Sequence, residues 1–300
     1  MDETAGAAGD RPLWRRIVDF PLVAMVLGIA VVFFGIFISA TAAKLVPPIA
    51  GFTPSIRFDL ICAPVLVILY KVVIRHLGEH PHDDLRLAGA VRPLSIGLGA
   101  GVAIFALVAA IAAIIGVYRV TGEGDFSQFL PALLLSAIFP AISEEMLFRG
   151  ALFRWIEEFG GSWAALLVTS ALFGAAHLSN PNATVVAAVG IAFEAGVMLG
   201  AAYMLTRSLW LPMGLHAAWN FTQGEIFDVP VSGTEVHGLV VARLSGPPLL
   251  TGNGFGLEAS LIAIIVATAF GLWLLWLAIR KGELVQPWWV RRRRAKRVAA

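Results

Sequence analysis

The sequence predicts an all-α fold: a polytopic transmembrane helix bundle of about eight spans with both termini in the cytoplasm. Of its 300 residues, 58% are hydrophobic and only 14% are charged, against about 45–50% and about 25% in soluble domains. The mean hydropathy is +0.82, which excludes a soluble domain and a disordered chain alike. The apolar runs are long and do not alternate, which excludes a membrane β-barrel.

Eight hydrophobic segments make up the predicted bundle. The first, third, sixth and eighth are long enough to cross a hydrocarbon core of about 30 Å alone. The fifth and seventh are shorter and carry histidines, which is typical of helices buried around a functional site, because lipid-facing helices need length and apolarity. The segments are Pro21–Ala43, Asp59–Ile74, Leu94–Val117, Phe129–Phe148, Trp163–His177, Thr184–Leu205, Leu209–Phe221 and Ala259–Ile279.

The basic residues set the orientation of this bundle. With eight spans and a cytoplasmic N-terminus, 18 of the 22 lysines and arginines fall on the cytoplasmic side and four on the other. This distribution follows the positive-inside rule. A seven-span bundle would place the cluster Arg291–Arg297 outside and fits worse. We interpret that cluster as a topology anchor, with a contact to anionic lipids as the alternative.

Three parts of the chain are distinguished by their content. Residues 1–128 hold N-terminal transmembrane helices, residues 129–224 hold the polar motifs, and residues 225–300 hold an extracytoplasmic loop, the last span and the basic tail. The first apolar run is too long for the core of a cleavable signal peptide. A single cysteine, Cys62, excludes an internal disulfide framework and a multi-cysteine zinc site.

Ionisable residues at membrane depth are costly, so each one suggests a function. Glu145 and Arg149 are four residues apart, share a helix face and can form an ion pair. Glu144 lies about 100° further round the helix, without such a local partner, and is available for chemistry. Taken alone, the three residues could equally be a salt-bridge anchor at a helix end.

Two further motifs place histidines inside apolar helices. Phe173 and His177 lie four apart, with Gly174 and two alanines between them that let another helix approach closely. His216 and Asn220 repeat this spacing on a later helix. Each motif alone is best explained by hydrogen bonds between helices, but together the three clusters indicate one polar cavity. Glu194, in the sixth segment, could be another site residue or a structural partner for a donor in the cavity, and we favour the structural role.

The residue inventory favours hydrolysis of an amide bond by activated water. The sequence has no Gly-x-Ser-x-Gly turn, no His-Glu-x-x-His motif and no Walker A loop. Glu144 can act as a general base on water with help from His177, and His216 and Asn220 can donate hydrogen bonds to the developing oxyanion. Glu144, His177 and His216 could instead hold Zn²⁺ with an open position for water. No cofactor other than this zinc is indicated.

The motifs Glu-Glu-x-x-x-Arg, Phe-x-x-x-His and His-x-x-x-Asn, in this order, resemble those of the CPBP family of intramembrane proteases. This family includes CAAX prenyl endopeptidase type 2 (Rce1-like) enzymes and the Abi group. The resemblance covers about residues 129–224 and implies that Glu144 activates water with His177, that His216 and Asn220 stabilise the oxyanion, and that Glu145 and Arg149 support the site. The family is commonly labelled metalloprotease, and a metal-free glutamate-type mechanism, which we favour, is also argued for it.

The resemblance also implies the partners and the location. We expect a membrane-associated protein or peptide as substrate, the lipid bilayer as surroundings, the bacterial inner (plasma) membrane as location, and no nucleic acid. Two other functions fit the composition: a multi-pass transporter, since intramembrane acids and histidines form proton relays, and a non-catalytic membrane immunity or scaffold protein.

Helix direction sets a condition on this site. Glu144 and His177 lie on successive helices that run in opposite directions. They meet only if the fourth helix continues past Arg149 to about Glu158. In that case we expect residues 179–182 to line a cavity rather than to face lipid.

Overall fold

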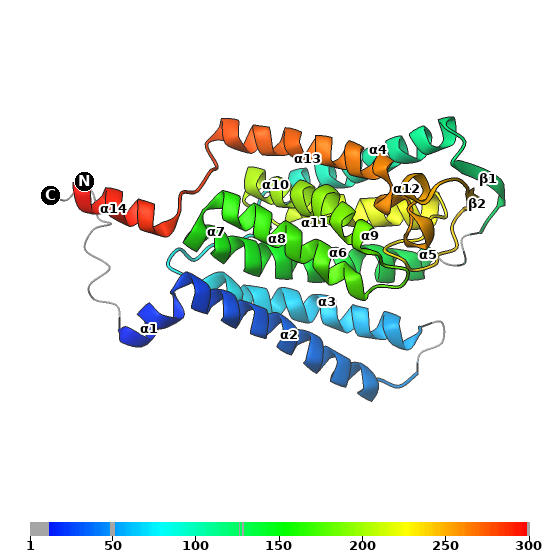
Figure 1. Cartoon of the computed structure of the whole chain (residues 1–300). Helices are drawn as coiled ribbons and strands as arrows, with labels where there is room; N and C mark the ends of the chain where they lie inside the picture. Colours follow the sequence, from blue (N-terminus) through cyan, green and yellow to red (C-terminus); the bar gives the residue numbers. More distant parts are fainter. Residues whose placement is uncertain (1–11, 49–51, 126, 128, 299–300) are drawn as a thin grey trace.

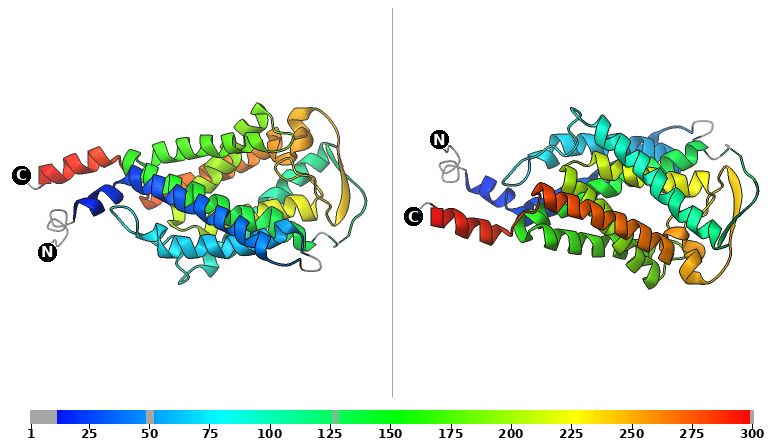
Figure 2. Two further views of the ribbon diagram at one scale, coloured as in Figure 1. Left: turned by 90° about the horizontal axis from the view of Figure 1, so that it is seen from below. Right: turned by 90° about the horizontal axis from the view of Figure 1, so that it is seen from above.

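The computed structural model describes residues 12–48, 52–125, 127 and 129–298 of the chain. The described part is a bundle of helices with roughly parallel axes (Figure 1). Helices α1 and α14 lie at one end of the bundle and strands β1 and β2 at the other, in the views from below and above as well (Figure 2). We call these ends the terminal end and the strand end.

The elements follow one another along the chain with short connections over most of its length. They are α1 (Leu13–Val18), α2 (Pro21–Leu45), α3 (Pro54–Val72), η1 (Ile74–His76), α4 (Val91–Ile114), β1 (Tyr118–Glu123), α5 (Phe129–Pro131), η2 (Ala132–Ile138), α6 (Phe139–Glu145), η3 (Met146–Phe153), α7 (Arg154–Gly160), α8 (Ser162–Ala176), η4 (His177–Ser179), α9 (Val185–Ile191), η5 (Ala192–Gly196), α10 (Val197–Thr206), α11 (Trp210–Phe221), η6 (Thr222–Ile226), β2 (Val240–Leu244), α12 (Pro248–Thr251), η7 (Asn253–Phe255), η8 (Leu257–Ala259), α13 (Leu261–Lys281) and α14 (Trp288–Val298).

The all-α membrane fold is confirmed. Within the described residues, six helices are long and apolar enough to cross a membrane: Pro21–Leu45, Val91–Ile114, Phe129–Gly160, Ser162–Ser179, Val185–Thr206 and Leu261–Lys281. The other two expected segments also form helices, but α3 contains Arg57, Asp59 and Lys71, and α11 has only 12 residues. The number of spans and the cytoplasmic position of the termini therefore stay predictions.

The fourth span is longer than the apolar segment that predicts it. The chain stays helical from Phe129 to Gly160, 32 residues, and turns at Gly161, which has a positive φ of 85° that suits glycine. The required continuation past Arg149 is thereby confirmed. Helix α8 then starts at Ser162 and runs back antiparallel, so Glu144 and His177 come to the same depth of the bundle.

Helices α4 and α11 pack backbone to backbone through glycines. A Cβ atom at Gly101 would lie 2.5 Å from the carbonyl oxygen of Leu215, and one at Gly97 would clash with the carbonyl oxygen of Leu211. Small residues spaced by four are typical of close contacts between membrane helices. This contact fixes α11, which carries two of the predicted site residues, against the first half of the chain.

A buried polar cluster closes the terminal end of the bundle. Asp84 is 1% exposed and accepts hydrogen bonds from the hydroxyls of Tyr70 and Tyr203. Arg154 donates to Asp84 at 3.3 Å and to the carbonyl oxygen of His82 at 3.0 Å. The cluster ties the loop before α4 to α7 and α10, and it satisfies a buried carboxylate in apolar surroundings.

Two small features were not predicted. Strands β1 and β2 pair antiparallel, with a register shift between Val120 and Gly122, although residues 124–239 separate them along the chain. They join the end of α4 to the loop before α13. The basic tail forms helix α14, in which Arg291 donates to the carbonyl oxygen of Glu158 at 2.6 Å. This contact attaches the tail to α7, and the role of the tail as a topology anchor stays a prediction.

Candidate active site

A cavity of about 370 Å³ brings the predicted site residues together. Its walls include Glu144 from α6, His177 from η4, and His216 and Asn220 from α11. The loop of residues 231–237 and the start of the fourth span at Pro131 complete its lining. Since that loop lies near the strands, the cavity opens toward the strand end. We call it the main cavity.

The helices that form the main cavity contain π-helical turns. Segments η2 and η3 are π-helical and flank α6, η5 interrupts the sixth span, and η6 continues α11. A π-helical turn is wider than an α-helical one and is frequent at functional sites. Of these turns, η2 lines the main cavity with Leu135 and Ser136, and the others contain or adjoin Glu145, Glu194 and Asn220.

Glu145 and Arg149 form the ion pair that their spacing predicts. Both side chains are 0% exposed, and the guanidinium Nη1 lies 2.8 Å from the carboxylate Oε1. Arg149 also donates to the carbonyl oxygens of Ala195 and Gly196 at 3.3 Å, and its guanidinium lies 4.7 Å from the ring centre of Phe173. These contacts hold Arg149 between three helices and neutralise one of the two acids.

Glu144 is left without such a partner. Its Oε2 atom is buried and has no hydrogen bond to another described residue, although the side chain lines the main cavity. A buried carboxylate oxygen without a protein partner requires water, a substrate or an ion to satisfy it. Glu145 also has a buried oxygen without a partner, Oε2, but its Oε1 is engaged by Arg149. The role of Glu144 in chemistry stays a prediction.

His177 is oriented by its own helix. Its Nδ1 atom lies 2.7 Å from the carbonyl oxygen of Phe173, and a carbonyl only accepts hydrogen bonds, so Nδ1 carries the proton. Its Nε2 then has the lone pair. The close approach expected at Gly174 is present, because a Cβ there would clash with the carbonyl oxygen of Ala188. The short distance between α8 and α9 thus fixes the helix end that carries His177.

His216 is oriented by Glu145. Its Nδ1 lies 3.0 Å from Oε1 of Glu145, which assigns the Nδ1 proton to the imidazole when the carboxylate is ionised. Within the described residues, the Nε2 atoms of His216 and His177 have no protein hydrogen-bond partner. Glu145 therefore contacts both Arg149 and His216. The sequence motifs predict only the contact with Arg149.

Asn220 and the loop after His177 complete the wall. The Asn220 amide donates to the carbonyl oxygen of Ser136 at 2.9 Å, which orients the amide and leaves its second N–H free of this contact. Of residues 179–182, Asn180 lines the main cavity as expected. Asn182 instead donates to the carbonyl oxygen of Gly233 at 3.3 Å and so supports the loop that covers the cavity.

Two acids behind the histidines extend the site. A second, small cavity of about 20 Å³, room for about one water molecule, is lined by Glu194, Glu258, His177 and His216 among others. Glu194 and Glu258 are 1% and 3% exposed, and the backbone N–H of Ser232 donates to Glu258. Burial raises the pKa of Glu258 to about 7.

Sequence reasoning missed Glu258, Ser136, Ser232 and the mouth residue His237. Glu258 lies in η8, just before the last span, and reaches the site because the preceding loop folds back into the bundle. No spacing rule reports such a contact. The only signal was an acid at the edge of an apolar run, which is also common at the ends of ordinary membrane helices.

The raised pKa of Glu258 gives a testable pH dependence. Its ordinary value is 4.5, so between pH 4.5 and about 7 the folded protein keeps a proton that the unfolded chain releases. Wild-type stability therefore falls with rising pH in this window. Glu258→Gln lacks this loss, and we expect its stability relative to wild type to improve by roughly 2–3 kcal/mol from pH 5 to pH 8.

Thermal unfolding of both proteins in detergent at the two pH values measures this difference. Glu235→Gln, which removes an exposed acid from the cavity mouth, is the matched control and should show no such change. If the stability difference between Glu258→Gln and wild type is the same at pH 5 and pH 8, the raised pKa of Glu258 is contradicted.

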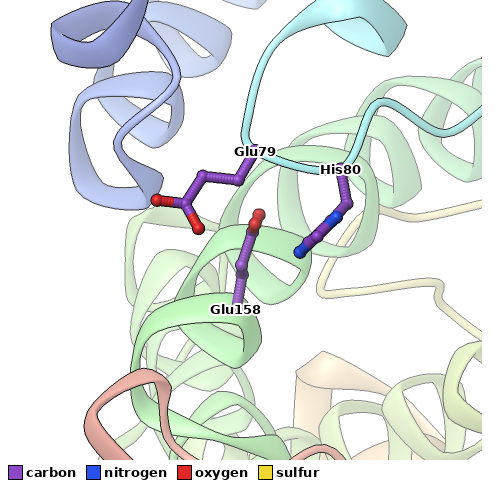
Figure 3. A group of neighbouring side chains, drawn as sticks. All are labelled: Glu79, His80 and Glu158. Atoms are coloured by element: carbon purple, nitrogen blue, oxygen red, sulfur yellow. The ribbon is translucent and has the colours of Figure 1, made fainter. Parts of the chain in front are cut away.

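A separate group of possible metal ligands lies at the terminal end. One ligand atom from each of Glu79, His80 and Glu158 lies within 4.8 Å of the others, and their side chains turn toward one another (Figure 3). The nearby Arg292 pairs with Glu79 at 3.5 Å. Among the described residues, Glu79, His80 and Glu158 form the group of three possible ligands whose atoms lie within this distance. Glu144, His177 and His216 line one cavity, but their ligand atoms do not lie within this distance of one another.

Comparison with known proteins gives a family match for the central helices. Residues 126–222 match the family model described as type II CAAX prenyl endopeptidase Rce1-like. The matched range includes Glu144, His177, His216 and Asn220 and confirms the resemblance that their motifs indicate. No significant match was found among curated proteins or solved structures.

Proposed function

We propose that this chain, whose residues 126–222 match the Rce1-like family model, is an intramembrane endopeptidase that hydrolyses a peptide bond of a membrane-associated substrate. The observation that carries the proposal is the main cavity, where the unpartnered carboxylate of Glu144 lies with His177 and His216. We propose the peptidase chemistry of the family for this chain, but we do not propose that its substrate is prenylated.

In the proposed reaction, Glu144 takes a proton from a water molecule in the main cavity. The water oxygen forms a bond to the carbonyl carbon of the peptide, and the carbonyl oxygen gains the negative charge. The carbon–nitrogen bond then breaks, and the protonated Glu144 returns the proton to the leaving amine. His177, with its Nε2 lone pair, orients the water or shares its proton during these steps.

The second amide N–H of Asn220 and Nε2 of His216 are the proposed donors to the oxyanion. Donation from Nε2 requires His216 to be protonated on both nitrogens, because Nδ1 already donates to Glu145. The adjacent carboxylate of Glu145 stabilises that imidazolium. In this proposal Glu145 and Arg149 act on the reaction through the position and charge of His216, without contact to the substrate.

The position of the cavity mouth indicates from which side of the membrane the substrate enters. The main cavity opens toward the strand end, whereas α1 and α14, which carry eight of the 22 lysines and arginines, lie at the terminal end (Figure 1). With the terminal end in the cytoplasm, as the positive-inside rule favours, the cavity opens outside. We therefore propose that the cleaved peptide segment reaches the site from the extracytoplasmic face.

A zinc-dependent version uses the same residues. The donor set of one Glu and two His suits Zn²⁺, and an Nδ1 atom hydrogen-bonded to a carbonyl or carboxylate is typical of zinc-binding histidines. The structure nevertheless does not bring the three side chains together as closely as the Glu79 group. We propose the metal-free mechanism, in which Glu144, assisted by His177, activates the water without a metal ion.

Metal analysis and chelation test this choice. The purified full chain in nanodiscs is incubated with membrane proteins from cells that lack it, and new N-termini are labelled and identified by mass spectrometry. We expect new N-termini to form at an unchanged rate in the presence of phenanthroline, and no stoichiometric zinc in the protein. Bound zinc, with cleavage that is lost on chelation and restored by added zinc, would overturn the metal-free mechanism.

A further inference from the structure

We propose that a second large cavity, at the terminal end of the bundle, binds an anionic phospholipid. This cavity has a volume of about 700 Å³ and lies between α4, α11 and α13, with the loop of residues 82–89 as its floor. We call it the lateral cavity. Its residues form a cationic part and an apolar part. The two parts correspond to the anionic headgroup and the acyl chain of a phospholipid.

The cationic part carries two arginines whose charges are not used elsewhere. Arg86 and Arg92 are exposed, line the lateral cavity, and form no ion pair or side-chain hydrogen bond with any other described residue. The other strong bases of the wall are engaged, since Arg207 pairs with Glu157 and Glu283, and Lys281 with Glu283. The two free guanidinium groups can bind a phosphate with charge-assisted hydrogen bonds.

The start of α4 adds a second anion-binding feature to the same wall. Helix α4 has 24 residues and begins at Val91, directly before Arg92, and its N-cap residue Ala90 supplies no side-chain hydrogen bond. Its first backbone N–H groups therefore have no cap, and the positive end of the helix dipole lies beside the two arginines. No acidic residue stands in the first turn of α4 to neutralise this charge.

The floor of the cavity is held in place. The backbone N–H of Leu209 donates to the carbonyl oxygen of Asp84 at 2.9 Å, and the indole of Trp210 donates to the carbonyl oxygen of Arg86 at 3.0 Å. These bonds tie the loop that carries Arg86 to the first turn of α11. The cationic part is therefore positioned before a ligand arrives, which lowers the entropic cost of binding.

The apolar part lies further from the terminal end. Ile96 and Ala100 of α4 face Phe270, Trp273 and Leu277 of α13 across it. This part can hold an acyl chain in line with a headgroup at Arg86 and Arg92. Basic pockets between membrane helices on the cytoplasmic side are typical binding sites for anionic lipids, and a free phosphate would use only the cationic part.

The lateral cavity adjoins the candidate active site. Leu215 lines both the lateral cavity and the small cavity behind the histidines, and it directly precedes His216 in α11. A bound lipid would thus pack against the helix that presents His216 and Asn220. The binding itself does not depend on the proposed peptidase activity and is measured without cleavage.

Native mass spectrometry of the delipidated full chain tests the inference, with phosphatidylglycerol, phosphatidylcholine and inorganic phosphate as probes. We expect Arg86→Gln/Arg92→Gln to weaken phosphatidylglycerol binding about 30-fold, from the loss of two charges near the headgroup. Phosphatidylcholine should bind the wild type more weakly than phosphatidylglycerol. Leu277→Trp, which fills the apolar part and keeps the charges, should weaken phosphatidylglycerol binding as well.

The matched control is Arg119→Gln/Arg243→Gln, which removes two exposed arginines that face each other across β1 and β2 at the strand end. It should bind phosphatidylglycerol like the wild type. Equal binding by the Arg86→Gln/Arg92→Gln variant, or no preference over phosphatidylcholine, would overturn the proposal. Displacement of the lipid by inorganic phosphate at equal concentration would overturn it too, in favour of a plain phosphate site.

Discussion

Glu144→Gln is expected to abolish peptide-bond cleavage, with a rate loss of about 10³-fold or more. Glutamine keeps the shape of the side chain and its place in the main cavity, but it cannot accept the proton of the attacking water. Loss of a general base costs up to about 10⁴-fold, and within the described residues no other acid with a buried, unpartnered oxygen lines the main cavity. The rate at which new N-termini form in the nanodisc assay measures the loss.

Two comparisons separate a chemical effect from a structural one. The unfolding temperature of Glu144→Gln should stay near that of the wild type, since the buried Oε2 has no protein partner to lose. Glu235→Gln removes an exposed acid at the mouth of the same cavity and should cleave normally. If Glu144→Gln cleaves at the wild-type rate, the peptidase mechanism proposed here is wrong, and a transporter or scaffold function gains support.

Arg149→Met is expected to destabilise the protein by about 3–5 kcal/mol. The substitution leaves the Glu145 carboxylate, 0% exposed, with His216 as its one remaining cationic partner. It also removes the contact of the guanidinium with the ring of Phe173. Thermal unfolding in detergent measures the change, and the yield of folded protein gives a second readout.

The double variant Glu145→Gln/Arg149→Met should recover much of this loss, because it removes both charges of the buried pair together. Arg15→Met is the matched control, since Arg15 and Asp19 form a pair with the same four-residue spacing but Arg15 is 40% exposed. Because water reaches the arginine, we expect this pair to contribute less than the fully buried one, although the Asp19 side chain is only 6% exposed. A loss in Arg149→Met no larger than in Arg15→Met would show that the buried pair is not a stabilising element.

The sequence predicted those parts of the fold and site that depend on neighbours along the chain. Hydropathy located the helices, because each long helix must be apolar over its own length. Four-residue spacing located Glu145 with Arg149 and His216 with Asn220, because such pairs share a helix face. The continuation of the fourth helix followed from the requirement that Glu144 and His177 meet at one depth.

Contacts between distant residues were beyond this reasoning. Glu145 and His216 are separated by 71 residues and Ser136 and Asn220 by 84, and no local pattern reports such pairs. Glu258 was missed for the same reason, since a loop carries it back to the histidines. Strands β1 and β2 were missed because a short pairing outside the helices has no signal in hydropathy.

The π-helical turns impose a condition on chain length that substitutions do not reveal. Segment η3 lies between Glu145, at the site, and Arg154, which binds Asp84 at the terminal end. Deleting one residue there, without a compensating change in the turns, would rotate everything beyond it by about 100°. Either Glu145 or Arg154 would then face the wrong neighbour. The number of residues between the two ends of this helix is therefore as constrained as the identity of the residues that contact the cavity.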